Sequence, residues 1–281
     1  MLVELHTHTN YSHGTKVFYD GINTPAEMVK QAERLGINAI VITDHDGIRG
    51  ALEAQRYAKK NNLDVKVVIG EEVTSSDGHI LGIGIQETVP PKLSTQETVD
   101  RIREQGGVAI AAHPFDIKRV GIGKNAIHCD AVEVFNAQNL DRLSNFKAAH
   151  FAKDNKMSMT AGSDAHSARM LGHGLNIARK GYTDEDIIKY VRKGRIQIKP
   201  RYPSMEVVTD LALNRLKMSS DYIGKYIEDN YSWPKRPISK GMLKMVDLYP
   251  GKISPVFRAF SYFSLANVIV YSVLHHAFER R

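Results

Sequence analysis

The chain has 281 residues, of which 42% are hydrophobic and 25% are charged, with a formal net charge of +7. This composition is typical of a soluble globular protein and excludes a largely disordered chain. Residues 201–281 contain twelve Lys and Arg against seven Asp and Glu, so most of the positive excess lies in the last part of the chain. The excess favours anionic partners, such as phosphate esters, nucleic acid or lipid head groups, without choosing among them.

The start of the chain and its cysteine content indicate a compartment. The first residues, MLVELHTH, lack the basic stretch and the long apolar segment of a secretory signal. Cys129 is the only cysteine, so it has no partner for an internal disulfide, and we expect it to be a small core residue. Both observations predict a protein of the reducing cytoplasm.

Strand-like and helix-like segments alternate from residue 1 to about residue 200. Short apolar runs predict strands over residues 3–6, 39–43, 65–69, 80–85, 108–112, 131–135, 157–161 and 196–198. Amphipathic stretches predict helices over residues 25–35, 50–61, 95–105, 141–155 and 184–193. Thr24 with Glu27, and Ser94 with Glu97, have the spacing of capping boxes. The alternation predicts a parallel sheet with crossover helices, either doubly wound or closed as a barrel.

Polar side chains recur at the carboxyl ends of the predicted strands. They are His6 with His8, Asp44 with His45, Glu72, His113, Asn136, and Asp164 with His166. In a barrel these ends meet at one mouth, whereas an open sheet spreads them along a crevice, so the pattern favours a barrel. Residues two apart on a strand share a face, so each His-x-His or Asp-x-His pair can bind ions in one pocket. We therefore expect a hydrolase with several metal ions.

Not every histidine or carboxylate near a strand end is expected to be a metal ligand. With His13 and His79, seven of the twelve histidines fit the set, and five do not: His128, His150, His173, His275 and His276. Of these five, His173 is expected to support the site or contact substrate, and the others to be structural. Glu71 and Glu72 face opposite sides of a strand, so only one of them can reach the ions. Asp44 is better explained as an orienting or helix-capping residue than as a ligand.

Seven short motifs occur in a fixed order along residues 1–200. They are HTHTNYSHG, ITDHDG, GEEVT, GHILGIG, AAHPF, VEVFNA and AGSDAH, and together they resemble the PHP family, named for polymerase and histidinol phosphatase. The resemblance implies that residues 1–200 form a PHP metal-dependent phosphoesterase domain, a distorted seven-stranded TIM-like α/β barrel. Two or three divalent metal ions would lie at its C-terminal mouth. Residues 201–281 match none of these motifs, and we expect them to form a helical extension.

The resemblance also implies a ligand set. One ion would be held by His6, His8 and Asp164. Glu72 would bridge this ion to a second, completed by His79 and His113. A third ion would be held by His13, His45 and His166. His13 stands where many relatives carry Asp in an SDG motif, and an imidazole there favours zinc, manganese or iron over magnesium.

Such ions activate water for attack on a phosphate ester, so we expect an enzyme that hydrolyses phosphomonoesters of nucleotides or small metabolites. His173, Asp44 or a water on a metal would protonate the leaving oxygen. Arg119, or as second choice Arg169, would hold the phosphate oxygens, although ordinary surface charge explains both arginines equally well.

Other functions stay open. One is an exonuclease-like phosphodiesterase on RNA or DNA, and another is a non-catalytic domain whose metals stabilise a scaffold. An amidohydrolase also begins with His-x-His in a barrel, but that class usually adds a bridging modified lysine. Glu72 takes that place here, and no Lys stands at the strand ends named above.

The last 80 residues are expected to be mostly helical, with breaks at Pro234, Pro237, Pro250 and Pro255. Residues 259–278 lack Asp, Glu, Lys and Arg and are long enough to span a membrane. Their composition is diluted by Ser261, Ser264, Asn267, Ser272, His275 and His276. We therefore expect a buried packing helix or a dimer seam, with membrane contact as the alternative. Single-stranded nucleic acid is a further possible partner, through stacking on Tyr222, Tyr226, Tyr231 and Trp233.

Overall fold

The computed structural model describes residues 1–13, 18–178, 183–249, 251 and 254–278 of the chain. Its strands are β1 Leu2–Glu4, β2 Ala39–Ile42, β3 Lys66–Thr74, β4 His79–Ile83, β5 Val108–Ala111, β6 Ala131–Asn136, β7 Ser158–Gly162, β8 Gly174–Ala178 and β9 Ile196–Pro200. Its α-helices are α1 Pro25–Arg34, α2 Arg49–Lys60, α3 Thr95–Glu104, α4 Leu143–Asp154, α5 Asp184–Arg192, α6 Met205–Met218, α7 Ser220–Asn230, α8 Lys235–Val246 and α9 Ser254–Phe278. Two short 3₁₀ helices are η1 Gly123–His128 and η2 Ala168–Met170.

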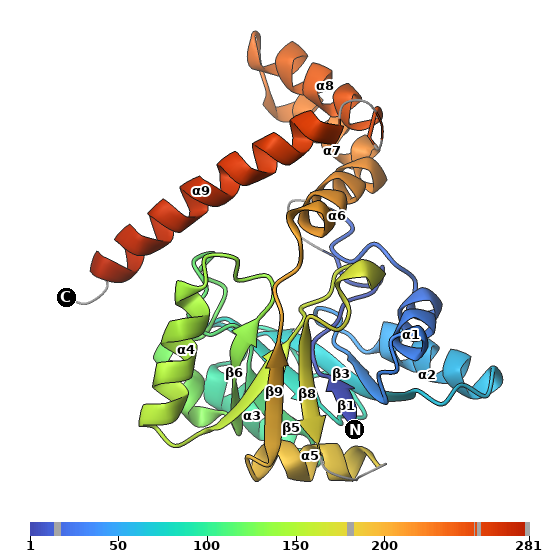
Figure 1. Ribbon diagram of the computed structural model, residues 1–281, viewed down its shortest axis with the longest axis vertical. Helices are drawn as coiled ribbons and strands as arrows, with labels where there is room; N and C mark the ends of the chain where they lie inside the picture. The colour runs from blue at the N-terminus through green and yellow to red at the C-terminus, as the bar shows by residue number, and fades with distance from the viewer. Residues whose placement is uncertain (14–17, 179–182, 250, 252–253, 279–281) are drawn as a thin grey trace.

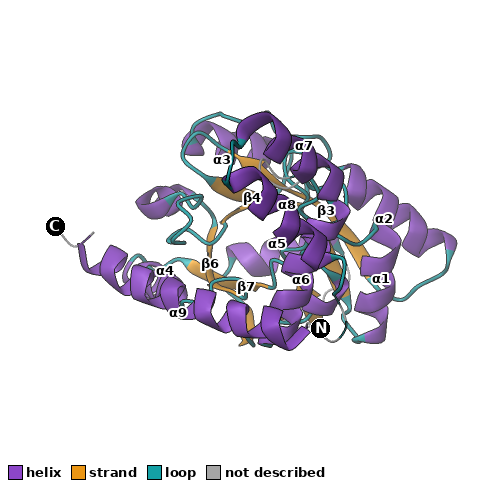
Figure 2. Cartoon of the chain, turned by 90° about the horizontal axis from the view of Figure 1, so that it is seen from above, coloured by secondary structure: helices purple, strands orange, loops and turns teal. Residues whose placement is uncertain are grey.

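The nine described strands form one nearly closed, barrel-like sheet in the order β7-β6-β5-β4-β3-β2-β1-β8-β9. Strands β7 and β8 come together where Ala161 and the side chain of Asn176 exchange two hydrogen bonds, at 2.9 and 2.7 Å. Helices surround the strands when the barrel is seen from above (Figure 2). The expected α/β barrel-like fold is therefore confirmed, with nine described strands in place of the seven expected. All eight strands and all five helices predicted within residues 1–200 are present.

The sheet is mixed, whereas the alternation of elements predicted a parallel one. Strand β4 pairs antiparallel with both β3 and β5, and β8 pairs antiparallel with β1 and β9. Strands β3 and β4 are joined by a tight turn in which the Ser75 hydroxyl accepts from the amide of Gly78 at 3.1 Å. A connection this short permits only a hairpin, because a parallel crossover needs about a dozen residues. Strand β8 was not predicted.

Local signals start several barrel helices. The capping boxes expected at Thr24–Glu27 and Ser94–Glu97 are both formed, at the starts of α1 and α3. Apolar strand residues such as Ile40, Ile80 and Ile110 are fully buried, either inside the barrel or beneath the helices. This packing fixes the strands and thereby brings their carboxyl ends to one mouth.

Helices α6–α9 follow the barrel and lie on the side of its mouth (Figure 1). Pro234 immediately precedes α8, Pro237 lies in its first turn, and Pro255 lies in the first turn of α9. Proline is tolerated there because the first helical amides have no partner within the helix. These prolines therefore mark helix starts, and Pro250 lies outside the described residues.

Helix α9 is a long arm that returns toward α4 (Figures 1 and 2). Ser272 is its one buried residue, and the side chains of Phe260, Phe263 and Phe278 are 64%, 69% and 72% exposed. The expectation of a packing helix buried within the chain is therefore wrong, although a dimer seam remains untested. Among the described helices, α9 alone is long and apolar enough to cross a membrane, a criterion that some core helices of soluble proteins also meet.

Candidate metal centre

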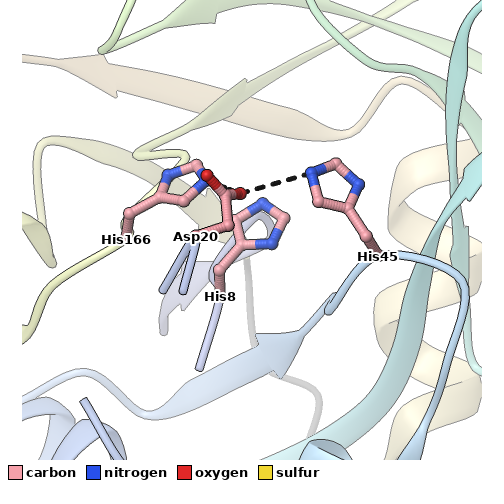
Figure 3. Close-up of side chains that lie close together, drawn as sticks. All are labelled: His8, Asp20, His45 and His166. Atoms are coloured by element: carbon pink, nitrogen blue, oxygen red, sulfur yellow. Dashed lines mark hydrogen bonds and ion pairs between the residues drawn. The ribbon is translucent and has the colours of Figure 1, made fainter. Parts of the chain in front are cut away.

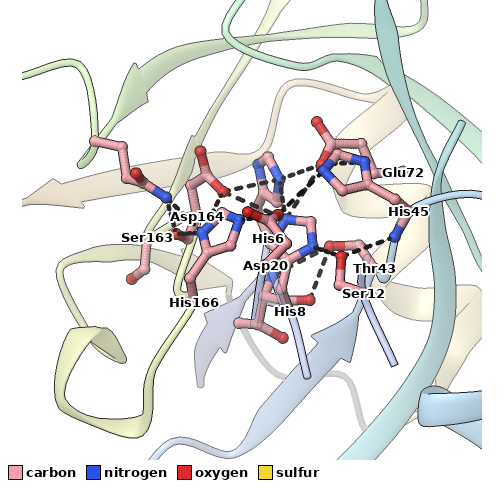
Figure 4. Close-up of polar contacts among 12 residues, drawn as sticks. His6, His8, Ser12, Asp20, Thr43, His45, Glu72, Ser163, Asp164 and His166 are labelled. Atoms are coloured by element: carbon pink, nitrogen blue, oxygen red, sulfur yellow. Dashed lines mark hydrogen bonds and ion pairs between the residues drawn. The ribbon is translucent and has the colours of Figure 1, made fainter. Parts of the chain in front are cut away.

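Histidine and carboxylate side chains from many strand ends converge at the barrel mouth (Figure 4). The described residues contain four overlapping groups whose ligand atoms lie within 4.8 Å of one another. They are His8, Asp20, His45 and His166; His6, His113 and Asp164; His6, His8 and Glu72; and His45, Glu72 and His79. Eight of the nine predicted ligands are present in these groups. The missing one is His13, and Asp20 is the additional member.

Glu72 lies at the centre of the cluster. Its two carboxylate oxygens lie between 2.9 and 3.4 Å from nitrogens of His6, His8, His45, His79 and His113. Glu71, its neighbour on β3, points to the opposite face, where its Oε2 accepts from the amide of Val89 at 2.9 Å. Burial raises the pKa of Glu71 to about 7. The geometry thus selects Glu72 as the carboxylate that can bridge two ions.

The donor atoms fit divalent metal ions. The Nε2 atoms of His6 and His8 are 3.1 Å apart, and both lie within 3.5 Å of Oδ1 of Asp164. Several buried atoms here lack a hydrogen-bond partner: Nδ1 of His45, His79 and His113, and Oδ1 of Asp164. Buried lone pairs that face one another are unfavourable unless a cation lies between them. Imidazole nitrogens with carboxylate oxygens suit zinc, manganese or iron.

The pKa values reflect the dense charge of this site. Burial alone would raise the pKa of Glu72, but His45 and His79 hold it well below its usual range. Burial would lower the pKa of His8, yet Asp164 and Glu72 raise it to about 9. Burial lowers the pKa of His166 to about 4, which keeps that imidazole neutral, as metal ligation requires.

Glu133 on β6 orients two of the ligands. Its Oε1 accepts from Nδ1 of His6 at 2.9 Å, and its Oε2 accepts from the amide of His113 at 2.9 Å. A hydrogen bond at Nδ1 fixes the tautomer of His6 and leaves Nε2 to face the ions. The sequence analysis missed Glu133, although a carboxylate inside the apolar strand motif VEVFNA was a usable signal.

Short polar side chains hold other parts of the cluster in place. The Ser12 hydroxyl lies 3.1 Å from Nδ1 of His8 and accepts from the amide of His45 at 3.2 Å. Asp44 accepts from the amide and the hydroxyl of Thr9, at 2.6 and 2.8 Å. Both oxygens of Asp44 thus anchor the loop after β1, which matches the expected orienting role and leaves neither oxygen directed at the ions.

Asp20 occupies the position that the sequence analysis assigned to His13. Its Oδ2 lies 2.7 Å from Nε2 of His166 and 3.4 Å from Nε2 of His45 (Figure 3). His13 is exposed, and its Nδ1 donates to the carbonyl of Phe18 at 3.1 Å. The signal was an Asp-Gly pair like that of the SDG motif, because Asp20 is followed by Gly21. A Cβ at Gly21 would lie 2.2 Å from the carbonyl oxygen of Thr9, so this turn needs glycine.

Arg215 connects this ligand to the C-terminal helices. From α6, its Nη2 donates to Oδ1 of Asp20 at 2.6 Å and its Nε donates to the Asp20 carbonyl at 2.5 Å. Burial alone would raise the pKa of Asp20, but His166 and Arg215 lower it far below its usual range. No sequence signal indicated Arg215, which lies 195 residues from its partner.

The three remaining predicted residues lie apart from the ligands. His173 is buried, and its Nδ1 donates to the carbonyl of Met170 at 2.8 Å. Burial lowers the pKa of His173, so its imidazole is neutral near pH 7. Arg119 is exposed, and its amide donates to the carbonyl of Asp116 at 3.3 Å, whereas its guanidinium forms no hydrogen bond or ion pair within the described part of the chain. Arg169 is paired with Glu206 and Asp210 of α6, so its charge is already engaged.

The chain matches the PHP domain over residues 4–156 and a PHP-associated region over residues 142–196, and it therefore belongs to the PHP family. An uncharacterized protein of Methanocaldococcus jannaschii is 40% identical over 151 residues, which cover 52% of this chain and 87% of that protein. An error-prone DNA polymerase of Mycobacterium bovis is 45% identical over 71 residues, which are 25% of this chain but 6% of the polymerase.

Two solved structures have a similar fold. One is a two-domain protein of Bacteroides vulgatus containing a predicted PHP-like metal-dependent phosphoesterase, with a TM-score of 0.59 and 18% identity. This likeness covers 77% of this chain and 69% of that protein. The other is PsfC of Pseudomonas syringae, with a TM-score of 0.57 and 17% identity over 77% of this chain and 98% of that one. At these identities the likeness shows the fold alone.

Proposed function

We propose that the protein is a metal-dependent phosphoesterase that hydrolyses phosphomonoesters of nucleotides or small metabolites. One observation carries the proposal. A central carboxylate, Glu72, contacts five histidines at a barrel mouth in a chain that belongs to the PHP family. Separate ions can occupy the overlapping groups around it, and two or three ions of zinc, manganese or iron match the donor set.

Each candidate ion has three donors, and Glu72 would also bridge the second ion to the first. The first would be held by His6, His8 and Asp164, and the second by Glu72, His79 and His113. The third would be held by His45, His166 and Asp20, with Asp20 in place of His13. When bound, such ions polarise a phosphate ester and lower the pKa of water from about 16 to about 7.

Exposure indicates the side from which the substrate enters. The side chains of His6 and His8 are fully buried, whereas those of His45, His79 and Asp20 are 16–20% exposed. The phosphate would therefore approach along this exposed rim. Arg119 is the arginine that we assign to the phosphate oxygens, because it is uncommitted among the described residues while Arg169 is paired with α6.

Neither side-chain candidate for the proton donor is directed at the cluster. Both oxygens of Asp44 accept hydrogen bonds from Thr9, and Nδ1 of His173 donates to a backbone carbonyl. We therefore assign these two residues to positioning, Asp44 for the loop after β1 and His173 for the turn before β8.

The single cysteine is a buried thiol, which supports a reducing cytoplasm as the compartment.

Product analysis on the full chain tests the proposal. Manganese-loaded protein would be given nucleoside monophosphates, 3',5'-bisphosphates, histidinol phosphate and short RNA, with His8→Ala as the control variant. The proposal predicts release of phosphate from small esters by the parent protein and loss of release in the variant. Mononucleotides released only from RNA would instead establish the exonuclease-like phosphodiesterase that the likeness to a polymerase supports. No turnover of any substrate would contradict both and favour a structural metal site.

A further inference from the structure

A large apolar cavity lies between the barrel mouth and the C-terminal helices. Its volume is about 1320 Å³, above the roughly 300–1,000 Å³ that is common for small-molecule sites. All four C-terminal helices contribute apolar side chains to its wall, among them Val208, Leu213, Ile227, Leu243, Phe257 and Leu265. The volume and lining suit a long apolar group better than a small polar metabolite.

Helix α9 forms one wall of this cavity. The lining residues of α9 recur every three or four positions, as one face of a helix requires: Val256, Phe257, Phe260, Ser261, Ser264, Leu265 and Val268. Two hydroxyl contacts hold the helix in place. Ser261 accepts from the Thr209 hydroxyl of α6 at 2.8 Å, and Ser272 donates to Asp141 at 2.7 Å. The wall is thus attached both to the helical region and to the loop after β6.

The polar end of the cavity adjoins the metal centre. Gln138, Asn139, Asp141 and Lys118 line it from the loops at the barrel mouth. The side-chain amide of Gln138 lies 2.5 Å from Nδ1 of His166 and donates to the carbonyl of Asp164 at 2.8 Å. One residue therefore lines the cavity and contacts two of the candidate metal ligands.

We infer that the substrate is an amphiphilic phosphomonoester, whose phosphate lies at the metal centre and whose long apolar chain lies in the cavity. The inference rests on the proposed function and narrows its substrate class. A molecule with one anionic end and one apolar end matches an apolar cavity whose lining residue Gln138 contacts the metal cluster. A sugar or a base placed there would lose hydrogen bonds to water without finding partners on apolar walls.

Alkyl phosphates of increasing length test this inference. The manganese-loaded full chain would be given butyl, octyl and dodecyl phosphate below their micelle concentrations. Burial of each further methylene is expected to raise kcat/KM by up to about fourfold until the cavity is filled. Equal kcat/KM for butyl and dodecyl phosphate would overturn the inference while leaving the phosphoesterase in place.

Two variants of the same helix give a matched comparison. Leu265→Asp places a charge in the cavity wall, so it should remove the dependence on chain length while butyl phosphate is still hydrolysed. Leu274→Asp, at a position of α9 that is 52% exposed and lies outside the wall, should leave the dependence unchanged. Should Leu265→Asp not fold, Ala212→Trp fills part of the cavity and should move the preference toward shorter chains. If Leu265→Asp and Ala212→Trp fold and keep the parent chain's preference for alkyl chain length, the inference is contradicted.

Binding is measured separately from turnover. Calorimetry with dodecylphosphonate and methylphosphonate, which are not hydrolysed, should show tighter binding of the longer compound, and Leu265→Asp should remove the difference. Such binding without hydrolysis of any ester would contradict the proposed function but support the cavity. Sedimentation of the parent chain as a dimer that Leu265→Asp dissociates, with no difference between the phosphonates, would assign the cavity to a second copy and overturn the inference.

Discussion

In the barrel, ionisable side chains lie buried against one another, whereas in helices α6–α9 large apolar side chains face solvent. His6, Glu72 and Asp164 have almost no exposed surface, yet Phe263 and Phe278 of α9 are 69% and 72% exposed. Each arrangement reverses the usual distribution of residues in a soluble protein. Buried charge is stabilised by cations or hydrogen bonds, and exposed apolar surface by another apolar body. We therefore expect the two regions to bind chemically different groups.

The two regions meet at Asp20. This residue belongs to the candidate metal centre, and Arg215 of α6 holds it with two hydrogen bonds. The amide of Tyr19 also donates to the hydroxyl of Ser219, at the junction of α6 and α7, at 3.4 Å. The C-terminal helices therefore contribute to the geometry of the candidate metal centre as well as to the apolar cavity.

The largest effect is expected from Glu72→Gln in the barrel. An amide is neutral and a weaker ligand, so the variant should lose at least one ion and more than about 100-fold in kcat/KM, since outer partners of metal ligands alone cost 10–100-fold. Phosphate release and metal content check this together. Glu71→Gln is the matched control and should be nearly silent, because its side chain faces away from the cluster. Equal losses in both variants would remove the bridging role from Glu72.

The second largest effect is expected from Asp20→Ala. The variant should bind one of the ions with about 100-fold lower affinity, because a charged oxygen beside His45 and His166 is lost. Titration of the metal-free protein with manganese measures this affinity. His13→Ala is the matched alanine variant and should leave the affinity for every manganese ion unchanged, since His13 is exposed. The opposite ranking would restore His13 as the ligand implied by the family resemblance.

Arg215→Ala tests the connection between the regions. It should lower the affinity for the same ion by about 10-fold, because Asp20 loses the partner that orients it, while the melting temperature changes little. Arg215→Lys should recover part of the affinity, which a merely structural role does not predict. Arg236→Ala, in α8 of the same region, is the control. If manganese affinity did not change in Arg215→Ala, the metal centre would be independent of the helices.

The smallest effect concerns helix capping. Thr24→Ala should lower the free energy of unfolding by about 1 kcal/mol, because the Thr24 hydroxyl accepts from the amide of Glu27 at the start of α1. Denaturant unfolding measures it. Ser204→Ala removes the corresponding cap of α6 and should destabilise the helical region by a similar amount. A barrel unaffected by the loss of Thr24 would show that packing alone determines where α1 begins.

Local patterns made much of the barrel predictable. Strand periodicity and capping boxes are encoded within a few residues, and pairs such as His6 with His8 share a face by geometry alone. The direction of β4 depends on the hairpin turn at Ser75–Gly78, which hydrophobic patterning does not specify. Glu133 was not predicted as part of the site, because the hydrophobic pattern of β6 indicates a core strand and gives no role to a single carboxylate within it.

The parts of the site that the sequence did not predict depend on contacts between residues far apart in the chain. The amide of Asp20 donates to the carbonyl of Ser12 at 3.0 Å, and Arg215 meets Asp20 across 195 residues of sequence. Residues 259–278 were expected to form a buried packing helix or a dimer seam, because composition does not say whether the covering partner belongs to the same molecule.

The central claim is that the buried cluster binds divalent metal ions around Glu72. Metal content per chain, measured by mass spectrometry after manganese or zinc loading and desalting, tests it most directly. We predict two or three ions in the parent chain and at least one fewer in Glu72→Gln. Less than one ion per folded parent chain, or equal content in the two proteins, would contradict it.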